Sequence, residues 1–329
     1  MDTFKSFNLD LSSVNEGNFG DIALQLFHFQ AENNPVYKNF IMNLRLDTFS
    51  VKSVADIPFL PISFFKNHLV KTGTWEPAQY FASSGTTSQQ ASAHPVRNLD
   101  FYLSHTEKCF EYFFGNIQNY HFLALLPSYL ERRGSSLVSM LDYFIKKSRS
   151  SFSGFYLHDT SKLLEDLEKL KNDGKKTILW GVTFALLDLA ERYHPDLNHC
   201  IVFETGGMKG RRAEITRPEL HSILTEAFQV PEIFSEYGMT ELFSQAYTRG
   251  SNTFFCPPWM KIIARDLTDP MRKGLLNETG GINVVDFANL DTVAFIETED
   301  LGKVDESGSF EILGRLDNSD VRGCNLMVE

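Results

Sequence analysis

Residues 177–212 read TILWGVTFALLDLAERYHPDLNHCIVFETGGMKGRR, and this stretch decides the fold class. It begins with an apolar, strand-like run at 177–182 and continues at 183–194 with apolar residues at helical spacing. A second strand-like run follows at 200–204. A strand, a crossover helix and another strand form a unit whose two strands are parallel. A loop rich in glycine and basic residues comes directly after the second strand, at 206–212.

The same alternation extends from this unit in both directions. Between about residues 78 and 241 the further strand-like and helical runs are AQYFA (78–82), LDFYLSHTEKCFEYFF (99–114), HFLALL (121–126), SSLVSMLDYFIKK (135–147), SGFYL (153–157), SKLLEDLEKLKN (161–172), RPELHSILTEAF (217–228) and EIFSE (232–236). The series predicts an α/β fold with a mostly parallel sheet and flanking helices. Such sheets bind ligands beyond the carboxyl ends of their strands, so the loops after the strands are the first candidates for chemistry.

The two ends of the chain differ from this pattern. Residues 1–75 contain helical runs such as 21–34 and an apolar, proline-marked segment at 57–66, and they predict a helical N-terminal segment packed on the core. Residues 76–249 are the predicted α/β core. Residues 250–329 carry short apolar runs between clusters of Gly, Asp and Asn, which is typical of hairpins and predicts a small antiparallel β subdomain.

The composition excludes several classes of function. The 329 residues include 31 Lys and Arg against 42 Asp and Glu, for a net charge of −11. An acidic surface repels phosphate backbones, so nucleic acid is not an expected partner. The sequence has no apolar run long enough for a membrane span and no secretory leader. The four cysteines form no CxxC pair, which argues against a zinc knuckle or a redox dithiol. The expected protein is cytoplasmic, with free thiols.

Five polar segments follow or end predicted strands. The first, Ser83-Ser-Gly-Thr-Thr-Ser88, offers many N–H and O–H donors that suit a phosphate, although it lacks the Walker A pattern. The others are Gly206-Gly-Met208, Tyr237-Gly-Met-Thr-Glu241, Thr298-Glu-Asp300 and Gly314-Arg-Leu-Asp317. Taken singly, each fits a surface loop or a solvated hairpin end as well as a ligand site. Glu241, for example, suits a helix N-terminus as well as it suits Mg²⁺.

As an ordered set, the five segments resemble the motifs of the adenylate-forming enzymes, the superfamily of acyl-CoA synthetases, peptide-synthetase adenylation domains and luciferases. The matches run from residue 83 to residue 324, and those at 237–241 and 314–317 are the most specific. The resemblance implies the large α/β domain of these enzymes with its small β subdomain, ATP and Mg²⁺ as cofactors, and a carboxylic acid as substrate. It also implies that the mobile C-terminal domain is absent, because the sequence stops soon after Asp317.

The resemblance implies a role for each matching residue. The predicted phosphate loop consists of Ser83, Ser84, Gly85, Thr86, Thr87 and Ser88, and the loop that packs on adenine consists of Gly206, Gly207 and Met208. The motif that begins with Tyr237 and Gly238 supplies Thr240 to an anion and Glu241 to Mg²⁺. Asp300 and Arg315 hold the ribose and the nucleotide.

Three longer segments, at 126–137, 235–247 and 314–326, look like the acyl-protein synthetase branch (LuxE-type) of the superfamily. In that branch a fatty acid is activated as acyl-AMP and passed to a cysteine near the C-terminus of the enzyme. From there it moves to a fatty-acid reductase subunit. Cys324 occupies the corresponding place, so the resemblance implies Cys324 as the acyl acceptor. It also implies an acyl reductase or another acyl-acceptor protein as a partner.

Two departures from the superfamily keep other interpretations open. Gln89 and Gln90 stand where many members carry a lysine after the phosphate loop, and the lysine of the C-terminal domain is absent with that domain. One alternative is an acyl-CoA or aryl-CoA ligase of the phenylacetate type, and another is a non-catalytic binding subunit. A Ser-His-Asp hydrolase ranks last because no G-x-S-x-G elbow is present. His121 is expected to be a satisfied core histidine, and Cys109 and Cys200 to be buried.

Overall fold

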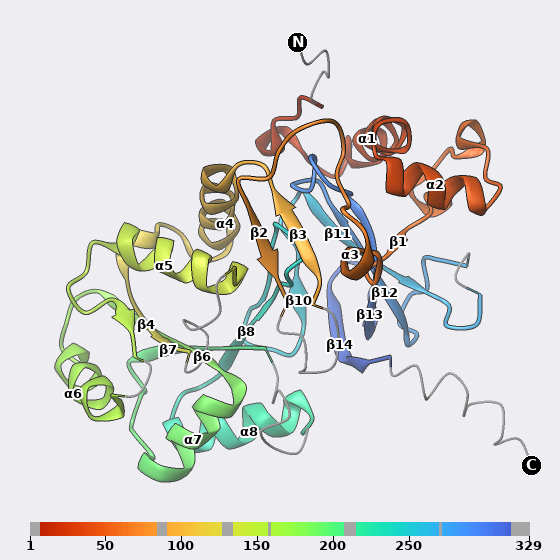
Figure 1. Ribbon diagram of the computed structural model, residues 1–329. Coiled ribbons are helices and arrows are strands. Elements are labelled where there is room, and N and C mark those ends of the chain that lie inside the picture. Colours follow the sequence, from red (N-terminus) through yellow and green to blue (C-terminus); the bar gives the residue numbers. More distant parts are fainter. Residues whose placement is uncertain are drawn as a thin grey trace, which may run out of the picture. The chain divides into compact units, whose positions relative to one another are not determined.

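A computed structural model of the chain describes residues 7–83, 91–126, 134–156, 159–206, 215–269 and 272–316 (Figure 1). The α-helices are α1 (Phe19–Asn33), α2 (Pro35–Asn43), α3 (Phe64–Asn67), α4 (Leu99–Phe114), α5 (Ser136–Ser148), α6 (Thr160–Leu170), α7 (Thr183–Tyr193) and α8 (Arg217–Phe228). The strands are β1 (Leu60–Pro61), β2 (Gln79–Ala82), β3 (Ala93–Val96), β4 (Tyr120–Leu125), β5 (Gly154–Phe155), β6 (Lys176–Val182), β7 (Cys200–Thr205), β8 (Ile233–Tyr237), β9 (Ala246–Thr248), β10 (Phe254–Phe255), β11 (Met260–Arg265), β12 (Gly280–Asp286), β13 (Phe295–Val304) and β14 (Phe310–Arg315).

By their internal contacts these elements group into two compact units. Unit 1 takes its described residues from Met1–Asn98, Glu241–Ser244 and Cys256–Glu329, and unit 2 takes them from Leu99–Thr240 and Gln245–Phe255. The chain therefore passes between the units several times, once between Thr240 and Glu241. The threefold division of the sequence at residues 75 and 249 stays a prediction about domains.

Unit 2 contains the parallel sheet that the alternating pattern predicts. Its strand order is β10-β9-β8-β7-β6-β4-β5, in which β4 to β8 are parallel and β9 and β10 are antiparallel additions. Helices cover both faces (Figure 1). On the face toward α4 and α5, Trp180 stacks on Phe203 at a ring distance of 4.5 Å, and Phe110 of α4 lies over Trp180. The α/β fold class is thus confirmed.

Local sequence signals account for the ends of several helices of unit 2. Helix α4 spans the predicted residues 99–114. Helix α8 begins after Thr216, whose side chain accepts a hydrogen bond from the Glu219 N–H as its N-cap. Pro218 lies in the first turn, where its missing N–H costs no helical hydrogen bond. The helix ends at Phe228, and the C-cap residue Gln229 is in the left-handed region, with φ of 56°.

Unit 1 contains the predicted antiparallel subdomain. Strands β11, β12, β13 and β14 pair antiparallel in that order, and β1 joins β13 as a parallel neighbour. The apolar segment at 57–66 is buried, as predicted, with Ile57, Leu60 and Phe65 in the core. Gln30 of α1 ties the N-terminal helices to this sheet, because its side chain bonds the Asn289 carbonyl at 3.0 Å and the Ala294 N–H at 2.9 Å.

One strand of unit 1 differs from its prediction. Residues 78–82 belong to the alternating series in the sequence, yet β2 pairs antiparallel with β3 in a separate two-stranded sheet. The partner β3 contains Pro95 and has the sequence AHPV, which carries no strand signal strong enough to predict it. No helix in the described parts of the chain is long and apolar enough to cross a membrane.

Candidate active site

The predicted site residues fall partly inside and partly outside the described regions. Ser83, Gly206, Tyr237, Gly238, Thr240, Glu241, Asp300 and Arg315 are described. Ser84, Gly85, Thr86, Thr87, Ser88, Gly207, Met208 and Cys324 lie outside the described residues. The described part of the site therefore consists of the strand ends that lead into the predicted loops.

In unit 1, Ser83 and Glu241 both meet Ser92. Ser83 directly follows β2, and its N–H donates to the Ser92 carbonyl at 3.1 Å. The Ser92 N–H returns a hydrogen bond to the Ser83 Oγ at 2.9 Å. Glu241 is buried and bonds the side chain of Ser92. The structure thus brings the start of the predicted phosphate loop and the predicted metal ligand onto one serine.

The carboxylate of Glu241 lacks full compensation for its burial. Burial raises the pKa of Glu241, while the hydrogen bond with Ser92 and the more distant charges of Arg315 and Lys66 act in the opposite direction. A buried carboxylate with a raised pKa favours an additional positive charge close by. Mg²⁺ is commonly bound by one or two carboxylates together with phosphate oxygens, so the residues present fit that ion.

The chain that follows Glu241 is fixed by a buried carboxylate of β12. Asp286 accepts hydrogen bonds from the N–H groups of Phe243 and Ser244, both at 2.9 Å, and from the Ser244 hydroxyl at 2.6 Å. Asn289 donates to the Glu241 carbonyl at 2.8 Å. These contacts hold the backbone on both sides of Leu242 and so position the Glu241 side chain.

Asp300 and Arg315 are neighbours across two strands of unit 1. They are register partners on β13 and β14, and the Arg315 Nε lies 3.5 Å from the Asp300 Oδ1. The Asp300 side chain is mostly buried, whereas the Arg315 side chain is 77% exposed. The carboxylate of the pair therefore lies toward the protein interior and the guanidinium lies toward solvent. This arrangement can accept sugar hydroxyls and attract a phosphate at the same place.

A buried arginine supports the strand that carries Asp300. Arg265 donates to the Ile282 carbonyl at 3.0 Å and to the Thr298 carbonyl at 2.9 Å, and Thr298 Oγ1 accepts the Asp300 N–H at 3.1 Å. A Cβ atom on Gly281 would lie 2.5 Å from the Arg265 Cζ, so only glycine leaves room for the guanidinium. This brace has no counterpart in the sequence motifs, because Arg265 and Gly281 lie outside them.

In unit 2, the remaining predicted residues lie at the carboxyl ends of β7 and β8. Gly206 follows β7 with φ of 76°, a backbone conformation that favours glycine. Tyr237 ends β8 and packs against Phe254 at a ring distance of 5.8 Å. Gly238 is exposed, and Thr240 is partly exposed. This is the edge of a parallel sheet at which ligands bind.

Two glutamates occupy the same end of these strands, and the motifs name neither. Glu204 of β7 is buried and accepts from Ser235 Oγ at 2.6 Å and from the Arg217 Nε at 3.2 Å, with His221 nearby at 3.7 Å. Burial opposes its ionisation, but the hydrogen bond with His221 and the charge of Arg217 outweigh that effect and lower the pKa of Glu204 to about 2.

The second glutamate, Glu236 of β8, has a different environment. Its Oε2 accepts a hydrogen bond from Thr205 Oγ1 at 2.7 Å. Burial, together with the charge of Glu204, raises the pKa of Glu236 to about 7 against the hydrogen bond from Thr205. Glu236 lies inside the predicted strand 232–236, and strand alternation would have placed it on the face opposite Ser235. The strand pattern therefore locates Glu236, while none of the five motifs gives it a role.

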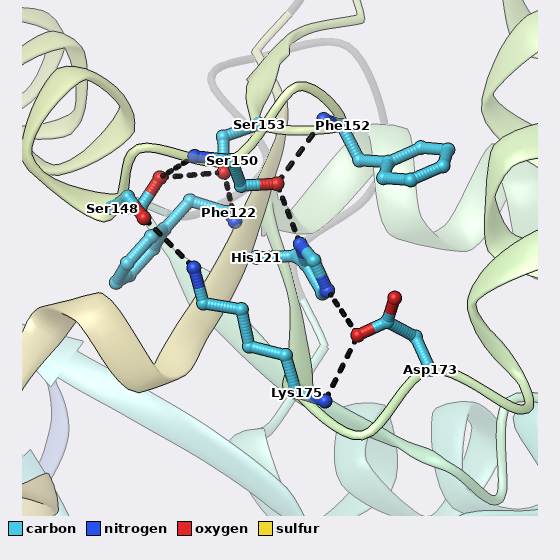
Figure 2. A network of polar contacts seen from close by, with 8 residues as sticks. All are labelled: His121, Phe122, Ser148, Ser150, Phe152, Ser153, Asp173 and Lys175. Carbon is cyan, nitrogen blue, oxygen red and sulfur yellow. Dashed lines mark hydrogen bonds and ion pairs between the residues drawn. The ribbon is translucent and has the colours of Figure 1, made fainter.

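A serine, a histidine and an aspartate meet at the opposite end of the sheet, near the start of β4 (Figure 2). The His121 Nδ1 lies 2.6 Å from the Ser150 Oγ, and its Nε2 lies 3.0 Å from the Asp173 Oδ1. The Ser150 Oγ also accepts the Phe152 N–H at 3.1 Å, so the three side chains tie the loops before β5 and β6 to β4. His121 is the buried, satisfied histidine that the sequence predicts. Cys109 and Cys200 are buried, also as predicted.

Metal ligands do not cluster in the described residues. No group of three or more His, Cys, Asp and Glu side chains that could hold a metal ion occurs among residues 7–83, 91–126, 134–156, 159–206, 215–269 and 272–316. A cation at Glu241 would therefore depend on oxygen atoms of a bound ligand as well as on the protein.

Solved structures share the fold, whereas sequence comparisons find nothing. No protein-family model and no curated protein matches the chain. ATP-bound MatB from Rhodopseudomonas palustris is 17% identical with a TM-score of 0.55, over 72% of this chain and 47% of that one. A 2-hydroxyisobutyryl-CoA ligase in the postadenylation state, in complex with R3-HIB-AMP, is 12% identical with a TM-score of 0.67, over 96% and 73% of the two chains.

A long-chain-fatty-acid-CoA ligase from Archaeoglobus fulgidus is 14% identical with a TM-score of 0.52, over 75% of this chain and 53% of that one. The chain spans about half the length of MatB and of the fatty-acid ligase. At these identities the likeness concerns the fold. The chain shares its fold with these three solved structures.

Proposed function

We propose that this protein activates a carboxylic acid with ATP, forming acyl-AMP and pyrophosphate, and passes the acyl group to a protein thiol. The observation that carries the proposal is the pair of polar groupings in unit 1. Ser83, Ser92 and Glu241 form one, and Asp300 with Arg315 forms the other. Phosphoryl and nucleotidyl transfer depend mainly on positioning and charge neutralisation, and these groupings can supply both.

Each described residue has a role in this proposal. Asp300 accepts the ribose hydroxyls, and Arg315 contacts the nucleotide. Glu241 holds Mg²⁺, which neutralises phosphate oxygens when bound. Thr240 bonds an anionic oxygen, while Gly206, Tyr237 and Gly238 line the adenine of the nucleotide. The segments that begin at Ser84 and Gly207 complete the phosphate and adenine contacts.

The acyl acceptor in this proposal is Cys324. A thiolate attacks the mixed anhydride, the carbon–sulfur bond forms, and AMP leaves with the bonding electrons of the cleaved C–O bond. The acid is a fatty acid or a related carboxylic acid, and the final acceptor is an acyl reductase or another acyl-acceptor protein. In this proposal the protein is located in the cytoplasm.

A coenzyme A ligase is the second candidate, because the similar structures include ligases named for 2-hydroxyisobutyryl-CoA and for long-chain-fatty-acid-CoA. In that case CoA replaces the protein thiol as nucleophile. A non-catalytic binding subunit is the third interpretation. Its supporting observation is the sequence Gln89-Gln90 in place of a lysine.

The test combines two measurements with ATP, Mg²⁺ and a panel of carboxylic acids. Acid-dependent exchange of labelled pyrophosphate into ATP reports adenylation, and hydroxylamine-sensitive label on the protein reports a thioester. Glu241→Ala should suppress exchange, and Cys324→Ser should abolish labelling but leave exchange intact. Equal labelling of Cys324→Ser and the wild type would reject Cys324. CoA-dependent release of AMP would favour the ligase, and no exchange with any acid or added partner would favour the binding subunit.

A further inference from the structure

The two faces of the sheet of unit 2 carry different polar groups at its carboxyl end. Side chains alternate along a strand, so Thr205 and Glu236 lie on one face while Glu204 and Ser235 lie on the other. Glu236 and Tyr247 are direct register partners on β8 and β9, which puts Tyr247 on the face of Glu236. This is the face covered by α4, since Phe110 and Phe114 of α4 pack on the Tyr247 ring at 6.3 and 5.4 Å.

The Glu236 carboxyl is enclosed by protein but remains within reach of a ligand. Glu236 keeps part of its surface accessible, although burial is the largest effect on its pKa. A Cβ atom on Gly238 would lie 2.1 Å from the Glu236 Oε1, so the carboxyl group stands directly against the exposed glycine of the Tyr-Gly-Met-Thr-Glu motif. A ligand bound at that motif would therefore contact the Glu236 carboxyl group.

The Tyr247 hydroxyl supports the same site from deeper in the core. Tyr247 is completely buried, and among the described residues its hydroxyl has no hydrogen-bond partner. Burial and then the charge of Glu236 raise the pKa of Tyr247, and Cys109 and Tyr102 of α4 contribute further. Tyr247 is thus the cross-strand neighbour of Glu236 on the face that α4 covers. A buried phenol without a partner is uncommon and calls for a specific explanation.

These groups limit what kind of acyl group can lie beside them. A methylene chain placed against Glu236 would remove water from the carboxyl group and would return no hydrogen bond. A hydroxyl or ammonium substituent would donate to Glu236 and, in the case of a hydroxyl, could also accept from Tyr247. Trp180 and Phe203 on the same face are fully buried under α4. Phe234, which packs near Phe203 and is partly exposed, can contact the apolar remainder of such an acid.

We propose that Glu236, supported by Tyr247, selects a carboxylic acid that carries a hydrogen-bond donor, a hydroxyl or an amino group, near the activated carboxyl. This inference rests on the proposed function, because it assigns the substrate class of that same reaction. Glu236 is a specificity-determining residue in this scheme and takes no part in the transfer of the acyl group.

The test measures acid-dependent pyrophosphate exchange with matched acids. The panel contains butyric and decanoic acid with their α-hydroxy, β-hydroxy, α-amino and β-amino derivatives. The wild type should favour at least one derivative over its parent acid by about tenfold or more in kcat/KM, because a site built to bond a donor rejects the analogue that lacks it. Hydroxy and amino derivatives form separate arms, so the preferred one identifies the donor.

The decisive comparison is the ratio of kcat/KM for derivative and parent acid within each variant. Glu236→Leu should bring this ratio close to one, and Tyr247→Phe should lower it several-fold. Glu236→Gln keeps the side-chain shape and replaces Glu236→Leu if that variant does not fold. Asp166→Asn and Tyr156→Phe are matched controls, because they break a buried carboxylate–phenol bond of 2.8 Å elsewhere in unit 2. They should leave the ratio unchanged.

The outcomes separate this inference from the proposed function. The inference would be overturned if the wild type and Glu236→Leu both exchanged the parent acids as fast as, or faster than, the hydroxy and amino derivatives. The proposed acid activation would stand in that case. No exchange with any acid would reject the proposed function itself. A large loss of stability in Glu236→Leu with an unchanged acid preference would show that the protein itself partners the carboxyl, which also overturns the inference.

Discussion

Glu204 and Glu236 lie at the same end of adjacent strands, yet their environments are opposite. Glu204 is surrounded by Ser235, Arg217 and His221, and its pKa is lowered to about 2. Glu236 accepts one short hydrogen bond from Thr205, and its pKa is raised to about 7. The comparison teaches that burial alone does not mark a functional carboxylate. The number of hydrogen-bond donors around the carboxylate is the better mark. A carboxylate whose oxygens are all bonded stabilises the structure, whereas one with few donors can still bind a ligand.

The largest effect on stability is expected from removing Glu204, the carboxylate that is fully supplied with hydrogen-bond donors. Glu204→Leu removes the buried carboxylate that bonds Ser235 and Arg217 and should lower the free energy of unfolding by about 3–5 kcal/mol, as measured by urea denaturation. The double variant Glu204→Leu/Arg217→Met should recover part of that loss, because it also removes the positive charge that faces Glu204. A loss below about 1 kcal/mol in the single variant would mean that the cluster contributes little, and the contrast with Glu236 would collapse.

A smaller effect of opposite sign is expected at Glu236. The folded pKa of this acid lies above its unfolded value, so the native state holds the extra proton and stability falls as the pH rises from about 4.5 to about 7. Glu236→Gln removes this loss and should be about 3 kcal/mol more stable than the wild type at pH 8. The two proteins should converge near pH 4, which thermal melts across the pH range can follow. A pH-independent difference would contradict the raised pKa.

Gly238→Ala tests whether the Glu236 carboxyl group packs directly against Gly238, because the two positions should then be energetically coupled. The added Cβ would meet the Glu236 Oε1 at 2.1 Å and would force the carboxyl group to move, at a cost of about 1 kcal/mol. The same substitution in a Glu236→Ala background should cost less. A double-mutant cycle on unfolding free energies measures this difference, and purely additive effects would show that the two groups do not touch.

The smallest effect is expected at Tyr247. Tyr247→Phe removes a buried hydroxyl that has no partner in the described residues, so its stability change should lie within about 0.5 kcal/mol of zero. Tyr156→Phe should cost about 1 kcal/mol, since that hydroxyl bonds Asp166 at 2.8 Å. Equal losses in the two variants would indicate that the Tyr247 hydroxyl has a partner after all.

Local sequence patterns predicted the regular elements of unit 2 well. Helix α4 spans the residues that the periodicity predicts, and α8 covers the predicted run 217–228, because periodicity acts over a few positions. Strand β3 was missed because its pairing with β2 is tertiary and its sequence contains Pro95. Whether a strand joins a parallel sheet or a separate ribbon depends on distant contacts that periodicity does not report.

The candidate site was predictable only where it coincides with a motif. Asp300 and Arg315 belong to two separate motifs, and the register of β13 and β14 makes them partners. The contact of Glu241 with Ser92 and the brace of Arg265 against Gly281 depend on three-dimensional packing, which a single sequence does not encode in a readable pattern. Glu236 and Tyr247 belong to this second group, since only strand pairing shows that they are neighbours.

The alternation of side chains along β7 and β8 has a consequence for how such a protein can be altered. Residues 204 and 235 serve one face and residues 205 and 236 serve the other, so substitutions on the two faces share few contacts. Among the described residues the two pairs share no side-chain hydrogen bond, and the charge of Glu204, which raises the pKa of Glu236, is the coupling that remains between them. An engineer, or natural variation, can retune the choice of acid on one side of these strands while the other side keeps the sheet folded.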